Sequence, residues 1–272
     1  MSSHSQSVLE FKSSDADVVL ISADNQKRPF AVHKCILSAA SPVFKDMFML
    51  PQPKATNGTL PVIDMVESSE VMFALLQFIY PVPNPVISSL DELVPVLEAA
   101  KKLDIDVAID SLRNQLVLFD HLENEPLRVY AIAARFDLQE ELRIAAKHTL
   151  KKNVLDCPLS EDLKHITAYD YHRLLDLHHR HSRAMQDALE PKRYTCHYIN
   201  CKPARWWTAF IQEANKELAE RPSTDVIFLP EFLQNSVSSV INQCSACPKT
   251  ALSSYADLLA LKRRIDELPF TV

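Results

Sequence analysis

Four of the six cysteines stand in two close pairs in the last third of the chain. The first pair is Cys196 and Cys201, in CHYINC, and the second pair is Cys244 and Cys247, in CSAC. A tetrahedral zinc ion needs four soft ligands about 2.3 Å away, and two short-spaced thiol pairs from separate segments are the usual way to supply them. The spacing therefore predicts a structural zinc ion held by these four thiols, with His197 as an alternative ligand in place of one of them.

Other interpretations of the cysteines stay open. The four paired cysteines could be unrelated reduced thiols, or Cys244 and Cys247 could form a redox-active dithiol. No strand-helix-strand pattern surrounds the second pair, which speaks against the dithiol. Cys35 has no nearby acid or second histidine to activate it, so we interpret it as a small buried side chain.

The composition excludes several kinds of catalytic and ligand site. The 272 residues include a single glycine, Gly58, whereas the phosphate-binding loops of P-loop and dinucleotide-binding proteins need at least two glycines in one loop. The sequence also has no Gly-x-Ser-x-Gly elbow and no His-Glu-x-x-His helix. We therefore expect a protein that is not an enzyme.

The net charge of -6 comes entirely from the first part of the chain. Residues 1–120 hold nine Lys or Arg and fifteen Asp or Glu, and the rest of the chain holds twenty of each. An acidic first part does not suit a nucleic-acid backbone.

No run of eighteen apolar residues occurs, and the start MSSHSQSVLE lacks the apolar run of a secretion signal. We expect a location in the nucleus or cytoplasm without membrane contact, where the cysteines stay reduced or bind metal.

Helices must position the cysteine pairs, and the spacing of apolar residues predicts them. Thr167 and Asp170 form a predicted capping box at the start of a long helix. Four histidines of that helix could bind a metal, but their spacing fits only in part, and we interpret them as packed or solvated: His172, His178, His179 and His181. The helices predicted from this periodicity are two within 126–150, one over 167–190, one over 206–218 and one over 251–268.

The N-terminal part of the chain follows a different pattern. Apolar residues alternate at the positions expected of strands, and Pro42 follows Ser41 where a helix should begin. The predicted strands are 17–21, 29–33 and 60–65, and the predicted helices are a pair within 34–48 and single helices over 68–80, 88–103 and 105–119.

Four ordered blocks of this N-terminal part resemble the BTB/POZ domain family. They are Asp-Val-x-Leu at 17–20, Phe-x-Val-His-Lys at 30–34, the run from Ile36 to Phe48, and Leu-Leu-Gln-Phe-Ile-Tyr at 75–80. The resemblance implies an α+β fold, with a small mixed sheet capped by helices, followed here by an all-α C-terminal region. We accordingly divide the chain into a flexible arm (1–14), a BTB/POZ domain (15–120), a helical extension (121–190) and a cysteine-containing helical tail (191–272).

The resemblance also implies two sets of interaction residues. In family dimers the positions of Asp17 and Lys34, next to His33, form a charged pocket. The alternative is that Asp17 caps a strand edge, Lys34 is a solvated helix start and His33 is packed. Family members that recruit a cullin often carry a hydrophobic-x-Glu motif near the end of the second helix, and the matching triplet here lacks the glutamate: Met47, Phe48 and Met49.

We therefore expect a non-catalytic protein-protein interaction module. It would self-associate as a homodimer and recruit protein partners, in transcriptional complexes or as a substrate adaptor of cullin ubiquitin ligases. The alternative is zinc-dependent nucleic-acid binding by the tail, in which Trp206 and Trp207 stack on bases beside the basic stretch 180–205. The neutral charge of the chain from residue 121 onward speaks against this alternative.

Overall fold

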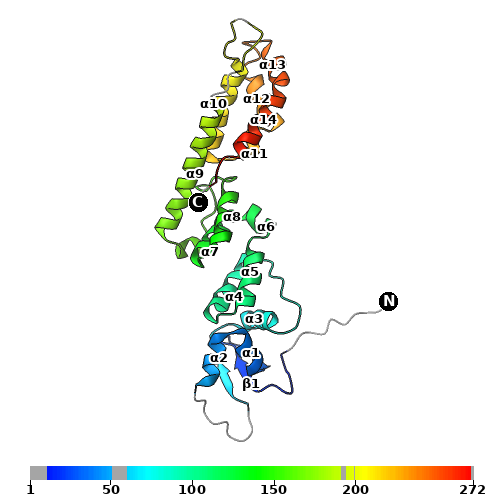
Figure 1. Ribbon diagram of the computed structural model, residues 1–272, viewed down its shortest axis with the longest axis vertical. Coiled ribbons are helices and arrows are strands. Elements are labelled where there is room, and N and C mark those ends of the chain that lie inside the picture. The colour runs from blue at the N-terminus through cyan, green and yellow to red at the C-terminus, as the bar shows by residue number, and fades with distance from the viewer. Residues whose placement is uncertain (1–10, 51–59, 191–193, 199, 271–272) are drawn as a thin grey trace, which may run out of the picture. The chain divides into compact units, whose positions relative to one another are not determined.

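The chain forms two units, Met1–Leu118 and Phe119–Val272. Figure 1 shows the computed structural model, which describes residues 11–50, 60–190, 194–198 and 200–270. The first unit combines strands and helices, and the second is helical, which confirms the predicted fold class. No helix within the described ranges is both long enough and apolar enough to span a bilayer.

The first unit is built on a mixed three-stranded sheet in the order β2-β1-β3. Its strands are β1 (Val18–Ile21), β2 (Pro29–Val32) and β3 (Val62–Asp64). β1 pairs antiparallel with β2 and parallel with β3. Because side chains alternate across a strand, every second residue of β1 and β2 faces the core, and these are buried: Val18, Leu20, Phe30 and Val32.

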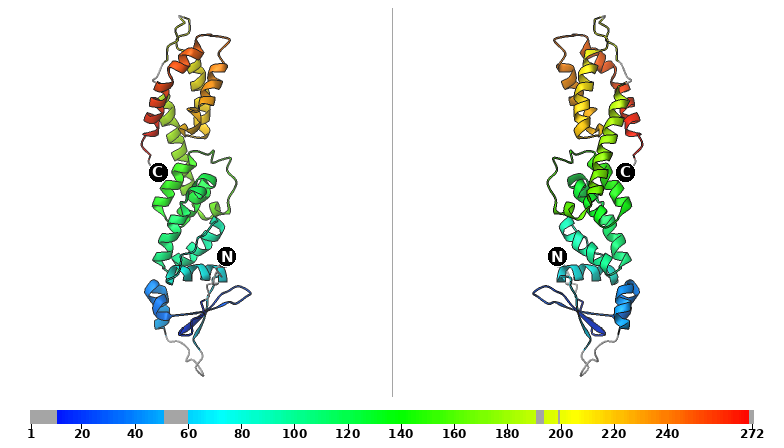
Figure 2. Two further views of the ribbon diagram at one scale, coloured as in Figure 1. Left: turned by 90° about the vertical axis from the view of Figure 1, so that its right-hand side faces the viewer. Right: turned by 90° about the vertical axis from the view of Figure 1, so that its left-hand side faces the viewer.

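Two short helices follow β2 and lie next to the sheet (Figure 2): α1 (Lys34–Ala40) and α2 (Pro42–Met49). Ser41 joins them. Its hydroxyl accepts a hydrogen bond from the Phe44 amide and donates one to the Leu103 carbonyl. Pro42 fits the first position of α2 because an amide there would have no partner within the helix. The chain therefore changes direction between the helices without a glycine.

Three further helices complete the first unit: α3 (Ser69–Ile79), α4 (Leu90–Lys102) and α5 (Asp106–Leu116). Ser68 and Ser89 cap the first two, each accepting a hydrogen bond from an amide in the first turn. Such a cap typically stabilises a helix by about 1 kcal/mol. Phe11 is also buried, with its ring 5.3 Å from that of Tyr80.

The second unit consists of helices. They are α6 (Phe119–Asn124), α7 (Pro126–Arg135), α8 (Gln139–Thr149), the short 3-10 helix η1 (Glu161–His165), α9 (Ala168–Leu189), α10 (Arg205–Glu220), α11 (Thr224–Ile227), α12 (Pro230–Ser238), α13 (Cys247–Ser253) and α14 (Tyr255–Asp266). The predicted capping box is present at the start of α9, where the Thr167 and Asp170 side chains accept hydrogen bonds from each other's amides. The structure divides the helix predicted over 251–268: α13 ends at Ser253, and Ser254, whose hydroxyl donates to the Thr250 carbonyl, separates it from α14.

Two helices end on a left-handed residue that is not glycine. Asp104 follows α4 with φ 53°, and Asp137 follows α7 with φ 56°. After α4, the Ile105 amide donates to the Ala100 carbonyl at 2.9 Å. This bond closes the helix end in the way that a glycine normally permits. Aspartate tolerates the left-handed conformation better than most residues, so the chain ends helices without glycine.

One predicted burial is wrong, and two predicted segments fall mostly outside the described residues. Cys35 is exposed. α1 buries Leu37 alone, so Cys35 lies on a different face of the helix. We expect an exposed loop over 49–59, around Gly58, and most of it (51–59) lies outside the described ranges, as do the first ten residues of the predicted arm.

The histidines of α9 differ in exposure. His178 is buried, His181 is half-buried, and His172 and His179 are exposed. The Nε2 atom of His178 lies 3.0 Å from the Thr149 hydroxyl oxygen. Since that hydroxyl donates its proton to a backbone carbonyl, Nε2 is the donor in this hydrogen bond. Burial, and then the charge of His181, lower the pKa of His178 to about 4.

We predict that His178 makes the second unit sensitive to acid. The unfolded chain binds a proton at His178 near pH 6.5, whereas the folded chain resists it until about pH 4. Stability is therefore lost as the pH falls through this range, by about 2 kcal/mol between pH 7.5 and pH 5 from this group alone. His178→Gln removes this contribution while retaining a side-chain donor. Urea unfolding followed by tryptophan fluorescence measures it, because both tryptophans lie in the second unit.

His179→Gln is the matched control, because His179 is exposed on the same helix. We expect the control to retain the pH dependence of the wild type. Equal slopes of unfolding free energy against pH for wild type and His178→Gln would contradict the assignment.

Candidate metal centre

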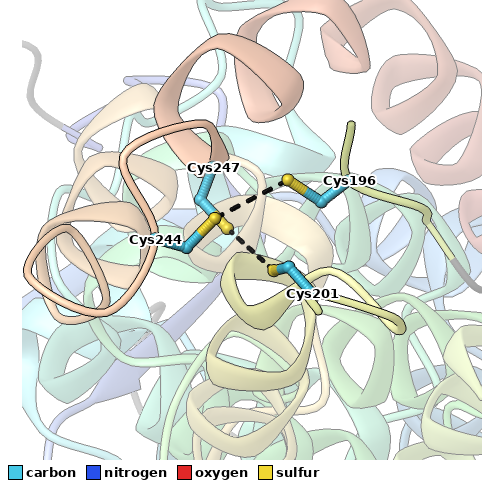
Figure 3. A group of neighbouring side chains, drawn as sticks. All are labelled: Cys196, Cys201, Cys244 and Cys247. Carbon is cyan, nitrogen blue, oxygen red and sulfur yellow. Dashed lines mark hydrogen bonds between the residues drawn. The ribbon is translucent and has the colours of Figure 1, made fainter. Parts of the chain in front are cut away.

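The first cysteine pair lies shortly before α10, and the second pair lies at the start of α13. Cys201 closes its turn with an amide hydrogen bond to the Tyr198 carbonyl, at 3.0 Å. Cys247, the first residue of α13, donates from its amide to the Cys244 carbonyl at 3.2 Å. Cys244 and Cys247 therefore bound one tight turn, and Cys201 closes a turn shortly before α10. Figure 3 shows all four sulfurs pointing toward a common centre.

The four sulfurs are close enough to bind one ion. Their Sγ atoms all lie within 4.8 Å of one another, and all four side chains are buried. The distance is 3.7 Å between Cys196 and Cys244 and 3.6 Å between Cys201 and Cys247. Sulfurs placed 2.3 Å from a tetrahedral ion are about 3.8 Å apart. None of the four forms a disulfide, so all four sulfurs are free to coordinate a metal ion.

Backbone amides donate hydrogen bonds to three of the sulfurs. The Arg205 amide lies 3.3 Å from the Cys201 sulfur. The Ala246 amide donates to Cys244, and the Trp206 amide donates to Cys247. Hydrogen bonds of this kind orient metal ligands and favour the charged thiolate over the thiol.

The fourth sulfur, that of Cys196, lies next to the Thr250 hydroxyl. Its oxygen lies 3.7 Å from the Cys196 sulfur and 3.0 Å from the Ala246 carbonyl oxygen. The hydroxyl has one proton for these two acceptors. A charged thiolate is the stronger acceptor, so the proton turns to Cys196 when that sulfur is ionised.

The thiols influence one another's ionisation. Burial alone would raise the pKa of Cys244, but the Ala246 amide and the three neighbouring thiols lower it to about 7. Burial, and then the neighbouring thiols of Cys201 and Cys244, raise the pKa of Cys247 to about 12. Burial likewise raises the pKa of Cys201. Several thiolates this close repel one another, so a cation at the centre is needed for all four to ionise.

The cysteines belong to an apolar core that joins α9 through α14. Trp206 and Trp207 are fully or almost fully buried in it, and the Tyr194 ring lies 4.7 Å from the Trp207 ring. Neither tryptophan can therefore stack on a base, as the nucleic-acid alternative requires. Other buried members of this core include Leu189, Phe210, Ala214, Leu218, Ile227, Leu258, Leu261 and Ile265.

His197 lies apart from the cluster that the four cysteines form. Its side chain is exposed, and it is not among the described residues that could hold a metal ion together. The cluster therefore consists of all four sequence-predicted cysteines without their predicted substitute. Sequence reasoning missed Thr250, although its position three residues after Cys247 places it one helical turn further along α13.

In the first unit, the residues expected to form a charged pocket lie close together. The Asp17 carboxylate accepts a hydrogen bond from the Lys34 backbone amide at 2.7 Å, so it caps the start of α1. The Lys34 ammonium lies 5.8 Å from the centre of the Phe48 ring. The His33 ring lies 3.1 Å from the Tyr80 hydroxyl and 3.2 Å from the Asp15 carboxylate.

The triplet at the end of α2 is unevenly exposed. Met47 and Phe48 are half-buried, and the Phe48 ring stacks on Phe44 with centres 6.0 Å apart. Met49 is 70% exposed. An unbranched, flexible side chain of this kind adapts to varied apolar partners.

The comparisons with known proteins agree with this architecture. Residues 8–118 match the family model described as the BTB/POZ domain, and no curated protein matches the sequence significantly. The first unit is thus an α+β domain of the class that mediates protein-protein interactions. It is a BTB/POZ domain, and the helical second unit with the cysteine cluster lies beyond the matched residues.

We predict that Thr250→Val weakens metal binding about tenfold, because it removes the hydroxyl donor beside Cys196 while conserving volume. Titration with Co²⁺, followed by the visible absorption of the cobalt-thiolate complex, measures the affinity. Ser245→Ala is the matched control, since Ser245 is exposed in the same turn as Cys244 and Cys247. An affinity of Thr250→Val equal to that of the control would show that the hydroxyl proton stays with Ala246.

Proposed function

We propose that the chain is a non-catalytic interaction protein whose BTB/POZ domain recruits partners and whose second unit is a docking surface held by a structural zinc ion. The convergence of four buried cysteine sulfurs within 4.8 Å supports the second part of this proposal. The family of the first unit supports the first part.

The donor set favours zinc over the other common divalent ions. Magnesium and calcium prefer oxygen ligands, whereas four thiolates suit zinc. A structural zinc site is closed, with four protein ligands, and a catalytic site keeps one position open for water. Cys196, Cys201, Cys244 and Cys247 would fill all four positions, so the ion would have no position for a substrate.

The surrounding charges suit such a complex. A divalent ion with four thiolates carries a net charge of -2, which is costly to bury without compensation. The segments 194–205 and 238–254 contain no Asp or Glu, and they hold Lys202, Arg205 and Lys249. All three side chains are exposed, so the segments that carry the four cysteines contribute positive and no negative side-chain charge.

The ion would couple metal binding to folding of the second unit. The two pairs of facing cysteines lie 48 and 46 residues apart in the sequence. Coordination would thus hold the turn before α10 against the turn before α13. Because the same turns border the aromatic core around Trp206, loss of the ion would loosen that core.

The BTB/POZ domain would supply self-association and partner recruitment. We place the pocket of Asp17, His33 and Lys34 at the homodimer contact, and the exposed end of α2 at Met49 on a partner-facing surface. The partners would be transcriptional regulators or a cullin ubiquitin ligase, in the nucleus or cytoplasm. Nucleic-acid binding by the tail is the weaker proposal, because Trp206 and Trp207 are buried and therefore cannot stack on bases.

We predict one zinc ion per chain in protein purified under reducing conditions, measured by elemental analysis. A strong chelator should remove the ion and abolish the cooperative unfolding transition seen by tryptophan fluorescence, because the core of the second unit loses its clamp. Cys247→Ser should behave like the chelated protein, whereas Cys157→Ser should retain both zinc and transition. Far less than one zinc per chain, or an unchanged transition after chelation, would refute the clamp.

We also predict that the protein sediments and scatters light as a homodimer. Lys34→Glu should weaken the dimer at least about tenfold, because it places like charges in the pocket. Lys45→Glu, an exposed position on α2, should leave the dimer unchanged. A protein that is monomeric at tens of micromolar and also fails to retain a cullin in a pull-down assay would contradict this account of the first unit.

A further inference from the structure

The sulfurs of the cysteine cluster face each other in pairs that join the two turns. Cys196 faces Cys244 at 3.7 Å, and Cys201 faces Cys247 at 3.6 Å, in hydrogen-bonding geometry (Figure 3). A disulfide bond brings two sulfurs to about 2.0 Å, so each pair would have to close by roughly 1.6 Å. Both pairs connect the segment before α10 with the segment around the start of α13.

We propose that this centre is a redox-sensitive clamp, in which oxidation by a peroxide replaces the zinc ion with two disulfides, Cys196–Cys244 and Cys201–Cys247. The inference rests on the zinc clamp proposed above. It adds that the reduced and oxidised states hold the same two turns together by different bonds. The second unit thus loses its metal on oxidation while its core stays closed.

The chemistry balances for each pair with one peroxide. One thiolate attacks a peroxide oxygen, the O–O bond breaks, and a sulfenic acid and a hydroxide ion form. The facing thiolate then attacks the sulfenic sulfur, an S–S bond forms, and a second hydroxide leaves. The two sulfurs lose two electrons to the peroxide, and two protons from solvent convert the hydroxides to water.

The exposures of the four cysteine residues, all of them buried, favour one order of the two steps. Cys196 and Cys244 are 5% and 7% exposed, whereas Cys201 and Cys247 are 3% and 0% exposed. Peroxide reaches the first pair more easily, so Cys196–Cys244 forms first. This step removes two of the four ligands and releases Zn²⁺ to solvent. Cys201 and Cys247 then lose the cation between them and react with a second peroxide.

The competing product is a local disulfide within one turn. A bond between Cys244 and Cys247, or between Cys196 and Cys201, would consume the ligands without connecting α13 to the segment before α10. The clamp would then open on oxidation, and the core around Trp206 would loosen as it does after chelation. The connectivity of the disulfides therefore distinguishes the two outcomes. Cross-turn disulfides keep the two turns joined after zinc is lost, whereas local disulfides leave them unconnected.

Peptide mapping by mass spectrometry of the full chain tests this inference. The zinc content of the reduced protein is measured first, and a protein without zinc would contradict the clamp itself before any oxidant is added. Hydrogen peroxide is then added stepwise, and released zinc is measured with a colorimetric chelator too weak to extract bound zinc. Free thiols are alkylated before digestion.

We expect release of one zinc per chain, Cys196–Cys244 at low peroxide, and both cross-turn disulfides at higher peroxide. The oxidised protein should keep the cooperative tryptophan transition that the chelated protein loses, and Cys35→Ser/Cys157→Ser should give the same map. Zinc retained after peroxide treatment, mainly Cys244–Cys247 or Cys196–Cys201 disulfides, or sulfinic and sulfonic acids without disulfides would each overturn the proposal.

Discussion

The second unit depends on the meeting of two turns that are far apart in the sequence. The four cysteine sulfurs of these turns lie within 4.8 Å of one another, and burial together with mutual repulsion opposes ionisation of all four without a cation. The backbone amides of Arg205, Trp206 and Ala246 already point at three of the sulfurs. The protein therefore presents a site arranged for charged thiolates. The four cysteines and the aromatic side chains of α10 to α14 belong to the same buried core.

The first unit relies on other means. Its sheet buries alternate residues of β1 and β2, and Ser41 ties the start of α2 to the end of α4. Short polar residues close the helix ends, with serine at the beginning of helices and Asp104 in the left-handed conformation after α4. The candidate metal group found among the described residues, that of the four paired cysteines, lies outside this unit. The chain thus joins an interaction domain that folds around apolar packing to a helical unit whose buried core includes four thiols.

Much of this arrangement follows from local sequence patterns. Local residue spacing predicts the three strands, the paired helices around Pro42 and the capping box at Thr167. Each of these patterns involves residues that are close together in the sequence. The four cysteines also come together as their spacing predicts. Two predictions failed because they depend on tertiary contacts. Cys35 was expected to be buried but is exposed, and the contact between the Thr250 hydroxyl and the Cys196 sulfur was not foreseen. Apolar periodicity also extends across Ser254, the residue that separates α13 from α14.

The central claim is that one zinc ion is bound by four cysteine thiolates in the second unit. X-ray absorption at the zinc edge of the purified, reduced protein tests this claim most directly, because it measures both the kind and the distance of the ligands. The account predicts a single shell of four sulfurs about 2.3 Å from zinc. A shell containing nitrogen or oxygen ligands, or a protein with no zinc to measure, would contradict it.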